Sequence, residues 1–361
     1  MLVKSASRLV FASLFAVLFA VSVPSDSLAS LPNTLQSAQS INARNNQLLY
    51  VADGSGPVAA YAAKSTGAVS PVLTISNPDP TNTYSYWNPW GVAFDRFGNL
   101  YVQSFLSDAT SFVFAPGARG HAVPRRIFMG GGPDSRSIAV DSAGYEYVAT
   151  SESSSEILVM APGVSGKSND LYHVAPLRTI FTDEAVWYPW PSLLAVDSRS
   201  DVLAAIVRSQ GNAVEVFAGG RSRNNSPIRV IAGPKTQLGS CSSTCENFAL
   251  TFSRYTGNIY VGVSSGARTR INMFAQNARE NAAPIRTIEG ANTGLQNSTI
   301  TGIAVSECTG EIYAMVKGSQ FGSPGKIVVF GRDARGNARP ERSFVDFKTR
   351  FADANGIALT P

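Results

Sequence analysis

The sequence has few residues of the kinds that most hydrolytic and metal enzymes use. It contains two histidines and three cysteines in 361 residues, and charged residues make up 15% of it. The formal net charge is only +5. Two histidines are too few for a zinc site built on several of them. A modest net charge does not indicate a nucleic-acid partner. Extended helical periodicity is also missing, which argues against a helical domain.

Long hydrophobic runs are likewise scarce, and the longest one lies near the N-terminus. Lys4 and Arg8 precede an apolar run over residues 9–23, and Ser27-Leu28-Ala29 offers small residues where a signal peptidase cleaves. The run is shorter than the ~20 residues that span a membrane. We therefore expect a signal peptide over residues 1–29 and an exported protein, periplasmic or extracellular, without stable membrane insertion. An uncleaved anchor is the alternative. Residues 30–46, rich in Ser, Asn and Gln, indicate a flexible lead-in.

The sequence does contain one unit that recurs six times. The first elements of the unit, of the type GIAVD, lie at 91–95, 137–141, 193–197, 249–253, 302–306 and 356–360. The second elements, of the type IYVA, lie at 48–53, 99–104, 145–150, 201–206, 258–263 and 311–316. The repeats thus start with a second element and end with a first one. A unit divided in this way between the two ends of a chain predicts a closed ring.

Four short strands make up each unit. Turns with Gly or Asn, such as residues 95–99, join the first two strands and are typical of antiparallel hairpins. A third strand ends in an aromatic residue or Met, and a fourth begins after a proline. The sequence therefore predicts an all-β, six-bladed β-propeller over residues 47–361, with four antiparallel strands per blade. The C-terminal strand 356–360 would close the ring by joining the N-terminal blade.

An arginine recurs at one position of the fourth strand in five of the units. These residues are Arg126, Arg178, Arg229, Arg286 and Arg342. Because the fourth strand would be the outermost one, we expect a free edge that charge and proline protect from pairing with other chains. A basic belt for an acidic partner is the alternative. Arginines spread around a rim do not favour nucleic acid, so we expect no nucleic-acid partner.

The three cysteines fall on two faces of the predicted ring. Cys241 and Cys245 share one loop between blades, whereas Cys308 lies in a turn between a first and a second strand. A strand length separates these faces, which exceeds the Cα distance that a disulfide allows. We therefore expect a disulfide between Cys241 and Cys245, with three thiols as the alternative.

Two stretches carry a family resemblance. GVAFDRFGNLYVQS (91–104) and PIRTIEGANTGLQNSTITGIAVSECTGEIYAMV (284–316) resemble the NHL repeat, which has a Pro-led outer strand, a loop, G-I-A-V-D, a Gly-Asn turn and I-Y-V-A. DVLAAI (201–206) and ALTFS (249–253) depart from that pattern. The resemblance covers residues 47–361 and implies a propeller whose first strands are innermost. NHL propellers include protein-binding and nucleic-acid-binding modules, and related six-bladed rings include lactonases and lyases, so the function stays open.

If the first strands are innermost, the loops that enter them line one end of the central channel, here called the mouth. All four tryptophans lie in two such loops, YWNPWG (86–91) and VWYPWP (186–191). Clustered aromatic rings suit a sugar or a protein hot spot. The alternative is that the rings wedge between blades. The candidate ligand-binding residues are Trp87, Trp90, Trp187, Tyr188 and Trp190, with Arg136, Glu246, Asn247 and Asn355 nearby.

Carboxylates at the mouth leave an enzymatic alternative. Asp134, Glu246 and Asp353 could hold Ca²⁺ with adjacent amides, as in lactonase-like propellers, although Arg136 would oppose a cation. His121 and His173 fall in linkers between third and fourth strands, away from the channel, so a histidine base is not expected there. We therefore favour a non-catalytic, monomeric binding propeller without a cofactor, whose ligand is a protein or a carbohydrate. A Ca²⁺-dependent lactonase or lyase is the alternative.

Overall fold

The computed structural model describes most of the chain from residue 47 onward. The described residues are 47–54, 56–78, 87–105, 110–130, 135, 137–150, 156–167, 172–181, 194–197, 199–206, 211–239, 247–265, 268–318, 322–349 and 351–361. They belong to one compact unit, Ala43–Pro361. The predicted signal peptide and the lead-in before residue 47 lie outside the described residues.

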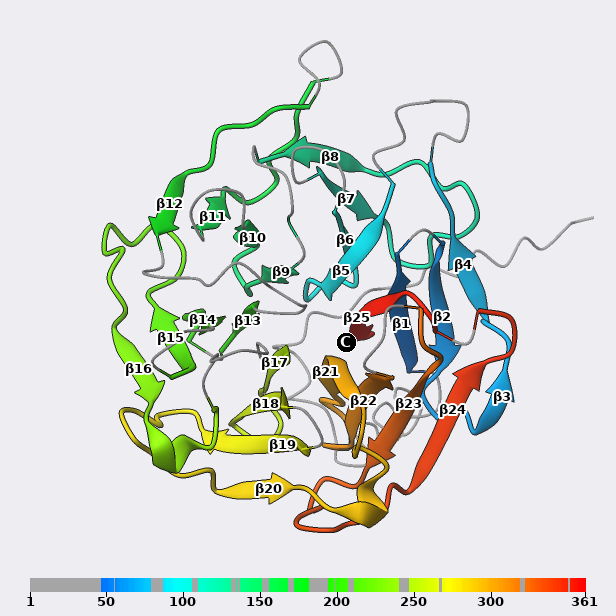
Figure 1. Cartoon of the computed structure of the whole chain (residues 1–361). Coiled ribbons are helices and arrows are strands. Elements are labelled where there is room, and N and C mark those ends of the chain that lie inside the picture. The colour runs from blue at the N-terminus through cyan, green and yellow to red at the C-terminus, as the bar shows by residue number, and fades with distance from the viewer. Residues whose placement is uncertain are drawn as a thin grey trace, which may run out of the picture. The chain divides into compact units, whose positions relative to one another are not determined.

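Six blades of four antiparallel strands surround a common axis, which confirms the predicted propeller (Figure 1). Blade one contains β25 (Ala354–Leu359), β1 (Leu48–Asp53), β2 (Val58–Ala62) and β4 (Leu73–Ile75). Blade two contains β5 (Pro89–Phe94), β6 (Leu100–Ser104), β7 (Thr110–Phe114) and β8 (Arg126–Met129). Blade three contains β9 (Ser137–Val140), β10 (Glu146–Thr150), β11 (Glu156–Met160) and β12 (Arg178–Phe181).

The other three blades follow the same order. Blade four contains β13 (Leu194–Val196), β14 (Val202–Ile206), β15 (Ala213–Phe217) and β16 (Arg229–Ala232). Blade five contains β17 (Asn247–Ser253), β18 (Asn258–Ser265), β19 (Arg268–Ala275) and β20 (Arg286–Ile288). Blade six contains β21 (Thr299–Val305), β22 (Ile312–Lys317), β23 (Gly325–Phe330) and β24 (Arg342–Asp346). Two short 3₁₀ helices, η3 (Pro234–Thr236) and η4 (Ala291–Thr293), lie in loops between blades.

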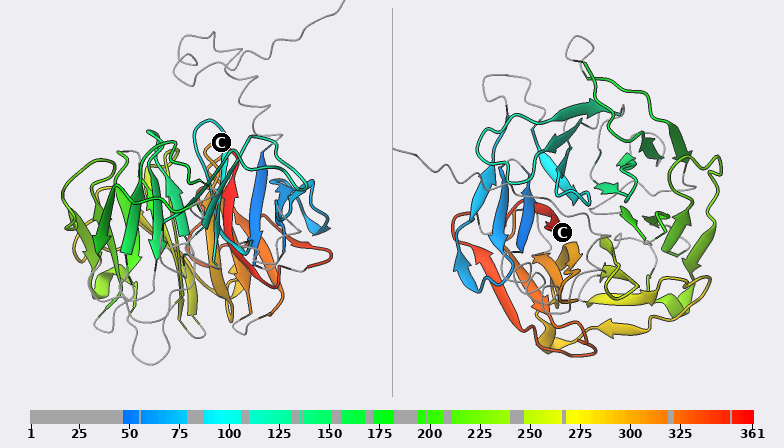
Figure 2. Two further views of the ribbon diagram at one scale, coloured as in Figure 1. Left: turned by 90° about the horizontal axis from the view of Figure 1, so that it is seen from above. Right: turned by 180° about the vertical axis from the view of Figure 1, so that it is seen from behind.

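The ring closes as the divided repeat predicts. The C-terminal strand β25 pairs antiparallel with β1, with Val51 opposite Ile357. Side chains strengthen this junction, because Gln47 Nε2 donates a hydrogen bond to the Thr360 carbonyl at 2.8 Å. Figure 1 shows the first strand of each blade nearest the axis, and the other two views show the same ring from the side and from behind (Figure 2). Residues of two chain segments more than 300 positions apart thus form one sheet.

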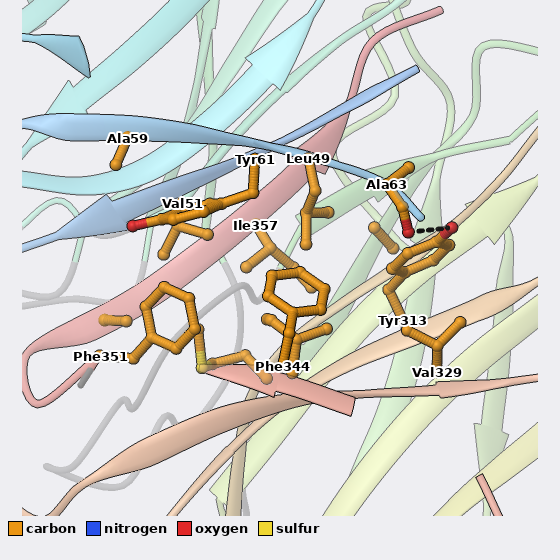
Figure 3. Close-up of a cluster of buried hydrophobic side chains, with 14 residues drawn as sticks. Leu49, Val51, Ala59, Tyr61, Ala63, Tyr313, Val329, Phe344, Phe351 and Ile357 are labelled. Atoms are coloured by element: carbon orange, nitrogen blue, oxygen red, sulfur yellow. Dashed lines mark hydrogen bonds between the residues drawn. The ribbon is translucent and has the colours of Figure 1, made fainter. Parts of the chain in front are cut away.

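The hydrophobic core lies between neighbouring blades, and each contact between two blades is here called a seam. Six clusters of buried side chains occur, one at each seam. At the seam between blades six and one, Tyr61 packs edge-on against Phe351 with ring centroids 5.3 Å apart, and Phe344 lies beside both rings (Figure 3). The residues that end the third strands are all buried: Tyr61, Phe114, Met160, Phe217, Phe274 and Phe330.

In blades two, three and four, the hairpins between first and second strands are built on aspartates. Asp95 Oδ1 accepts hydrogen bonds from the main-chain N–H groups of Phe97 and Asn99, both at 2.9 Å. Asp141 and Asp197 repeat this arrangement in the next two blades. A carboxylate that is bound to its own turn in this way fixes the hairpin rather than serving a ligand.

The prediction of free outer edges is wrong. In blade six the fourth strand, β24, pairs in parallel with β3 (Gly67–Val69) of blade one. Shorter parallel bridges join four further fourth strands to the linker of the next blade: Ile75 to Gly120, Met129 to His173, Ile231 to Glu280 and Ile288 to Gly336. At the remaining seam, Asn225 Nδ2 donates to the Thr179 carbonyl at 2.9 Å. The edges are therefore covered by the next blade.

The recurrent arginines also contact the next blade, so they do not form the basic belt that was the alternative. Arg126 Nη1 lies 2.9 Å from Glu146 Oε1 in the next blade. Arg178 and Arg229 donate to main-chain carbonyls of the following blade, including those of Asn224 and Ala278. Arg286 lies 4.0 Å from Asp333, and Arg342 donates to the Ala63 carbonyl at 3.0 Å. The fourth-strand arginine thus links five blades to their neighbours.

Candidate functional site

In blades one, two and six, the residue that enters the innermost strand at the mouth lies in a β-bulge. The pairing of first and second strands shifts between Pro89 and Gly91, between Ile300 and Gly302, and between the partners of Ala52 and Asp53. The extra residues are Trp90, Thr301 and Asn355. A bulge turns its extra side chain away from the regular alternation of the strand. All three of these side chains are buried, so the bulges direct them into the ring.

The side chains of Trp87 and Trp90 are buried instead of exposed to solvent. Each has 8% of its surface exposed. Trp87 lies edge-on to Phe112 with ring centroids 5.5 Å apart, and its Nε1 donates to the Gly56 carbonyl of blade one. Trp90 stacks on Phe105 at 4.7 Å. Trp87 thus belongs to the core between blades one and two, which favours the wedge interpretation for this loop.

Other predicted mouth residues lie outside the described residues. These are Trp187, Tyr188, Trp190, Arg136, Glu246, Asp134, Cys241 and Cys245. Asn247 is the first residue of β17 and pairs with Ser264 of β18. Cys308 is half-buried in the turn between β21 and β22, as predicted. The ligand contacts, the Cys241–Cys245 bond and most of the proposed metal ligands therefore remain predictions.

A buried polar cluster at the mouth joins blade six to blade one. Lys317 Nζ donates a hydrogen bond to Asn355 Oδ1 at 3.4 Å, and Asn355 Nδ2 donates to the Asp353 carbonyl at 2.7 Å. Lys317 is 8% exposed and Asn355 is 2% exposed. Asp53, also buried, lies opposite Ala354 in the β1–β25 pairing. The four residues are here called the closure cluster: Asp53, Lys317, Asp353 and Asn355.

Charge and burial oppose each other within this cluster. Burial lowers the pKa of Lys317, while the negative charges of Asp353 and Asp53 raise it in part. Burial raises the pKa of Asp53, against the effect of a hydrogen bond from Thr349. Both groups are thus displaced toward their neutral forms, which is the usual response of ionisable groups that lose contact with water.

The closure cluster does not have the composition of a Ca²⁺ site. Such a site needs several oxygen ligands converging on one point. Asp353 and Asn355 are present, but the ammonium of Lys317 binds the side-chain oxygen of Asn355. Across the described residues, no group of three or more His, Cys, Asp or Glu is placed to hold a metal ion. The calcium alternative therefore depends on Asp134 and Glu246, outside the described residues.

Sequence reasoning missed Lys317, although the repeat contains a signal for it. When the second strands are superposed by their tyrosines, Lys317 of blade six takes the position of Ser264 in blade five. Ser264 Oγ accepts a hydrogen bond from the main-chain N–H of Ile300 in the next blade at 2.9 Å. The signal is a lysine at the position that holds a serine in the preceding repeat.

A cavity of about 280 Å³ occupies the axis of the ring. Residues from the innermost strands of all six blades line it, and Arg96, Arg254 and Glu307 stand where those strands end, opposite the mouth. Glu307 accepts hydrogen bonds from the main-chain N–H groups of Arg254 and Tyr255. The described lining contains neither histidine nor cysteine, so the usual nucleophile–base pairs cannot be assembled from it.

Comparisons with solved structures support the propeller fold. One similar chain comes from a crystal structure of a nidogen/laminin complex, with a TM-score of 0.56 and 12% identity over 88% of this chain and 99% of that one. Another is a protein of unknown function from Bacteroides caccae, with a TM-score of 0.58 and 10% identity over 87% of this chain and 99% of that one. Identities this low show the fold alone.

Sequence comparisons do not extend this result. No protein-family model matches the chain, and no curated protein matches it in sequence. The NHL resemblance therefore stays an interpretation of the repeat pattern. Within the part of the chain that the structure describes, no helix is both long and apolar enough to cross a membrane.

Proposed function

We propose that the protein is an exported, non-catalytic binding module whose ligand, a protein or a carbohydrate, is held at the mouth of the propeller. The observation that carries this proposal is the closure cluster. Where a metal-dependent propeller enzyme would direct carboxylates and amides at a cation, this chain buries the ammonium of Lys317 against Asn355. The described polar groups at the mouth therefore serve to join blades, which is the role of a scaffold.

The ligand-binding surface in this proposal is the loop with Trp187, Tyr188 and Trp190. Trp87 and Trp90 offer little area for contact because both are largely covered. Large aromatic side chains dominate the energy of many recognition surfaces. A ring of the same fold belongs to a nidogen/laminin complex, which agrees with a protein ligand without assigning one.

A paired substitution tests the proposal. Purified parent protein is screened against immobilised glycans and exported proteins, after treatment with a chelator, and the captured ligand is then titrated against Trp187→Ala/Trp190→Ala. We expect the double variant to bind about thirtyfold more weakly, a loss of about 2 kcal/mol, while its melting temperature changes little. Unchanged affinity for the ligand would remove these residues from the proposed site.

Trp87→Ala is the matched control because this residue takes the same position in the other loop. Its ring is buried among Phe112 and Phe114, so truncation should cost about 3–5 kcal/mol of folding free energy. A strong loss of stability in Trp87→Ala, together with a loss of binding only in the double variant, supports the proposal. If a hydrolytic activity appears when Ca²⁺ is added back, the enzymatic alternative is favoured instead.

A further inference from the structure

The cavity on the axis of the ring is bordered by one position of the repeat that is small in every unit. The third residue of each first element is alanine or threonine: Ala93, Ala139, Ala195, Thr251, Ala304 and Ala358. All six residues line the cavity. Protein interiors are otherwise closely packed, so longer side chains at this position would narrow the space. The small side chains leave about 280 Å³ open.

The cavity opens at the end opposite the mouth, here called the exit. Lining residues near the middle of the innermost strands, such as Ile138 and Leu194, are buried. Lining residues just beyond the ends of those strands are exposed, as Arg96, Arg254 and Glu307 show. A molecule from solution would therefore enter past the charged side chains at the exit.

The walls behind the exit are mostly apolar. The second and fourth residues of each first element, such as Val92 and Phe94 in blade two, are apolar in all six units, and all of them line the cavity. Apolar surface gains free energy when it is taken out of water. The cavity therefore suits the apolar part of a small molecule.

The carboxylates in the described lining are bound to hairpins. Asp95 and Asp141 are buried and accept hydrogen bonds within their own turns. The two carboxylate oxygens of Glu307 accept hydrogen bonds from the main-chain N–H groups of Arg254 and Tyr255, at 3.0 and 2.7 Å. These acids thus fix turns, and their hydrogen-bonding capacity is largely used.

The two arginines of the lining differ from these acids. Among the described residues, neither Arg96 nor Arg254 forms an ion pair. The guanidinium of Arg96 lies over the ring of Phe97, with its carbon 4.7 Å from the ring centroid, and this contact leaves N–H groups available. The two arginines follow the innermost strands of blades two and five, which are opposite in a ring of six. Like charges around one opening attract an anion.

We propose that the exit cavity binds an aliphatic carboxylate of medium chain length. Its carboxylate lies between Arg96 and Arg254, because guanidinium groups bind carboxylates strongly through paired hydrogen bonds. Its chain occupies the apolar space behind them. An apolar cavity of about 150 Å³ takes up benzene, so about 280 Å³ holds roughly ten non-hydrogen atoms, or a chain of about eight carbons. This site is separate from the proposed ligand site at the mouth.

Isothermal titration calorimetry with octanoate tests the proposal on the full chain, after copurified fatty acids have been extracted. We expect saturable binding of one octanoate per chain. Acetate and inorganic phosphate lack the chain and should bind about a hundredfold more weakly or worse. Octylammonium has the chain with the opposite charge and should not bind measurably. No binding of octanoate, or equal binding of acetate, would overturn the proposal, since the latter result shows an adventitious ion only.

A double variant tests the two arginines. Arg96→Gln/Arg254→Gln should weaken octanoate binding about thirtyfold, because two charged hydrogen-bond donors are lost. Both side chains are exposed, so the melting temperature should change little. Arg335→Gln/Arg339→Gln is the matched control, since it removes the same charge at exposed positions outside the cavity. An equal loss of affinity in the two double variants would show that net charge alone attracts octanoate, and the proposal would fail.

A third variant tests whether the chain of octanoate lies inside the ring. Ala93 lines the cavity and is half-buried, so the longer side chain of Ala93→Leu extends into the open space. We expect at least a tenfold loss of octanoate affinity, about the effect of filling space that the chain would occupy. Parent-like affinity in a variant that melts like the parent would contradict the proposal. If Ala93→Leu does not fold, the comparison of octanoate with acetate and the arginine pair still decides.

Discussion

At the scale of single residues, the sequence predicts those side chains whose partners are close in the chain. The turn at residues 95–99 is predictable from sequence, because Asp95 binds main-chain N–H groups only two and four positions later, and Asp141 repeats this in the next blade. Lys317 could not be assigned in this way, since its partner Asn355 belongs to another blade. Burial of Trp87 likewise depends on Gly56 and Phe112, which sequence spacing does not bring together.

The contact between Glu146 and Arg126 of the preceding blade can be tested through the pH dependence of stability. Burial raises its pKa to about 7, while the Arg126 charge lowers it in part. Glu146 Oε2 is buried without a hydrogen-bond partner, which disfavours the charged form. The folded state therefore holds the Glu146 proton more strongly than the unfolded state does. The contribution of this group to stability is complete below the ordinary glutamate pKa of 4.5 and is lost as pH rises through about 7.

Replacement by an uncharged analogue should remove that dependence. We expect the stability of Glu146→Gln, relative to the parent, to increase between pH 4 and pH 8 by up to a few kcal/mol. Chemical unfolding curves at several pH values measure it. A difference that stays constant over this range would show that Glu146 titrates normally in the folded protein.

At the scale of elements, the positions of strands were predictable and the contacts between blades were not. Alternating apolar residues and Gly or Asn turns locate each hairpin, because these signals act within a few residues. The parallel pairing of β3 with β24 joins residues from opposite ends of the chain. No local pattern indicates such a partner. The sequence therefore predicts edge protection for the fourth-strand arginines, whereas the structure shows them bound to the next blade.

Arg342 is the best test of that role. It donates to the Tyr313 hydroxyl at 2.7 Å and to the Ala63 carbonyl of blade one at 3.0 Å. Burial would raise the pKa of Glu311, but hydrogen bonds and charge from Arg342 outweigh it and lower the pKa. Arg342→Ala should cost about 3 kcal/mol of folding free energy, because it leaves buried acceptors without a donor.

Arg335→Ala is the control for this measurement. Arg335 lies exposed in the linker between third and fourth strands of the same blade. Its removal should change stability by less than about 0.5 kcal/mol. Equal effects of the two substitutions in denaturant unfolding would mean that Arg342 acts only through net charge and that the seam contact contributes nothing.

At the scale of the whole molecule, the ring was predictable because the repeat is divided between the two ends. β25 supplies the innermost strand of blade one, as predicted from a repeat that starts with a second element at 48–53 and ends with a first element at 356–360. Function was not predictable to the same degree. The loops that differ between repeats carry the candidate ligand contacts, and their sequences lack the periodicity that located the strands.

Removal of residues 355–361 tests closure. The deletion takes away most of β25. Strand β1 would lose its hydrogen-bonding partner, and the neighbouring apolar side chains would become exposed to solvent. The loss should exceed the ~5–15 kcal/mol that stabilises a typical domain. We expect a chain without a cooperative thermal transition, measured by circular dichroism. Deletion of the exposed Pro361 alone is the control, and a long truncation that melts like this control would contradict the closed ring.

The meeting of residues 48 and 360 also bears on how the chain can be rearranged. The main-chain N–H of Leu48 donates to Thr360 Oγ1 at 3.1 Å, and the N–H of Thr360 returns a hydrogen bond to the Leu48 carbonyl. Two positions held this closely could be spliced by a short glycine linker, and the chain could then be opened at another loop. A circular permutant made in this way would begin and end at a blade boundary, with its β1–β25 pairing covalently continuous. The order of blades along the gene is thus one of several that the same architecture can accommodate.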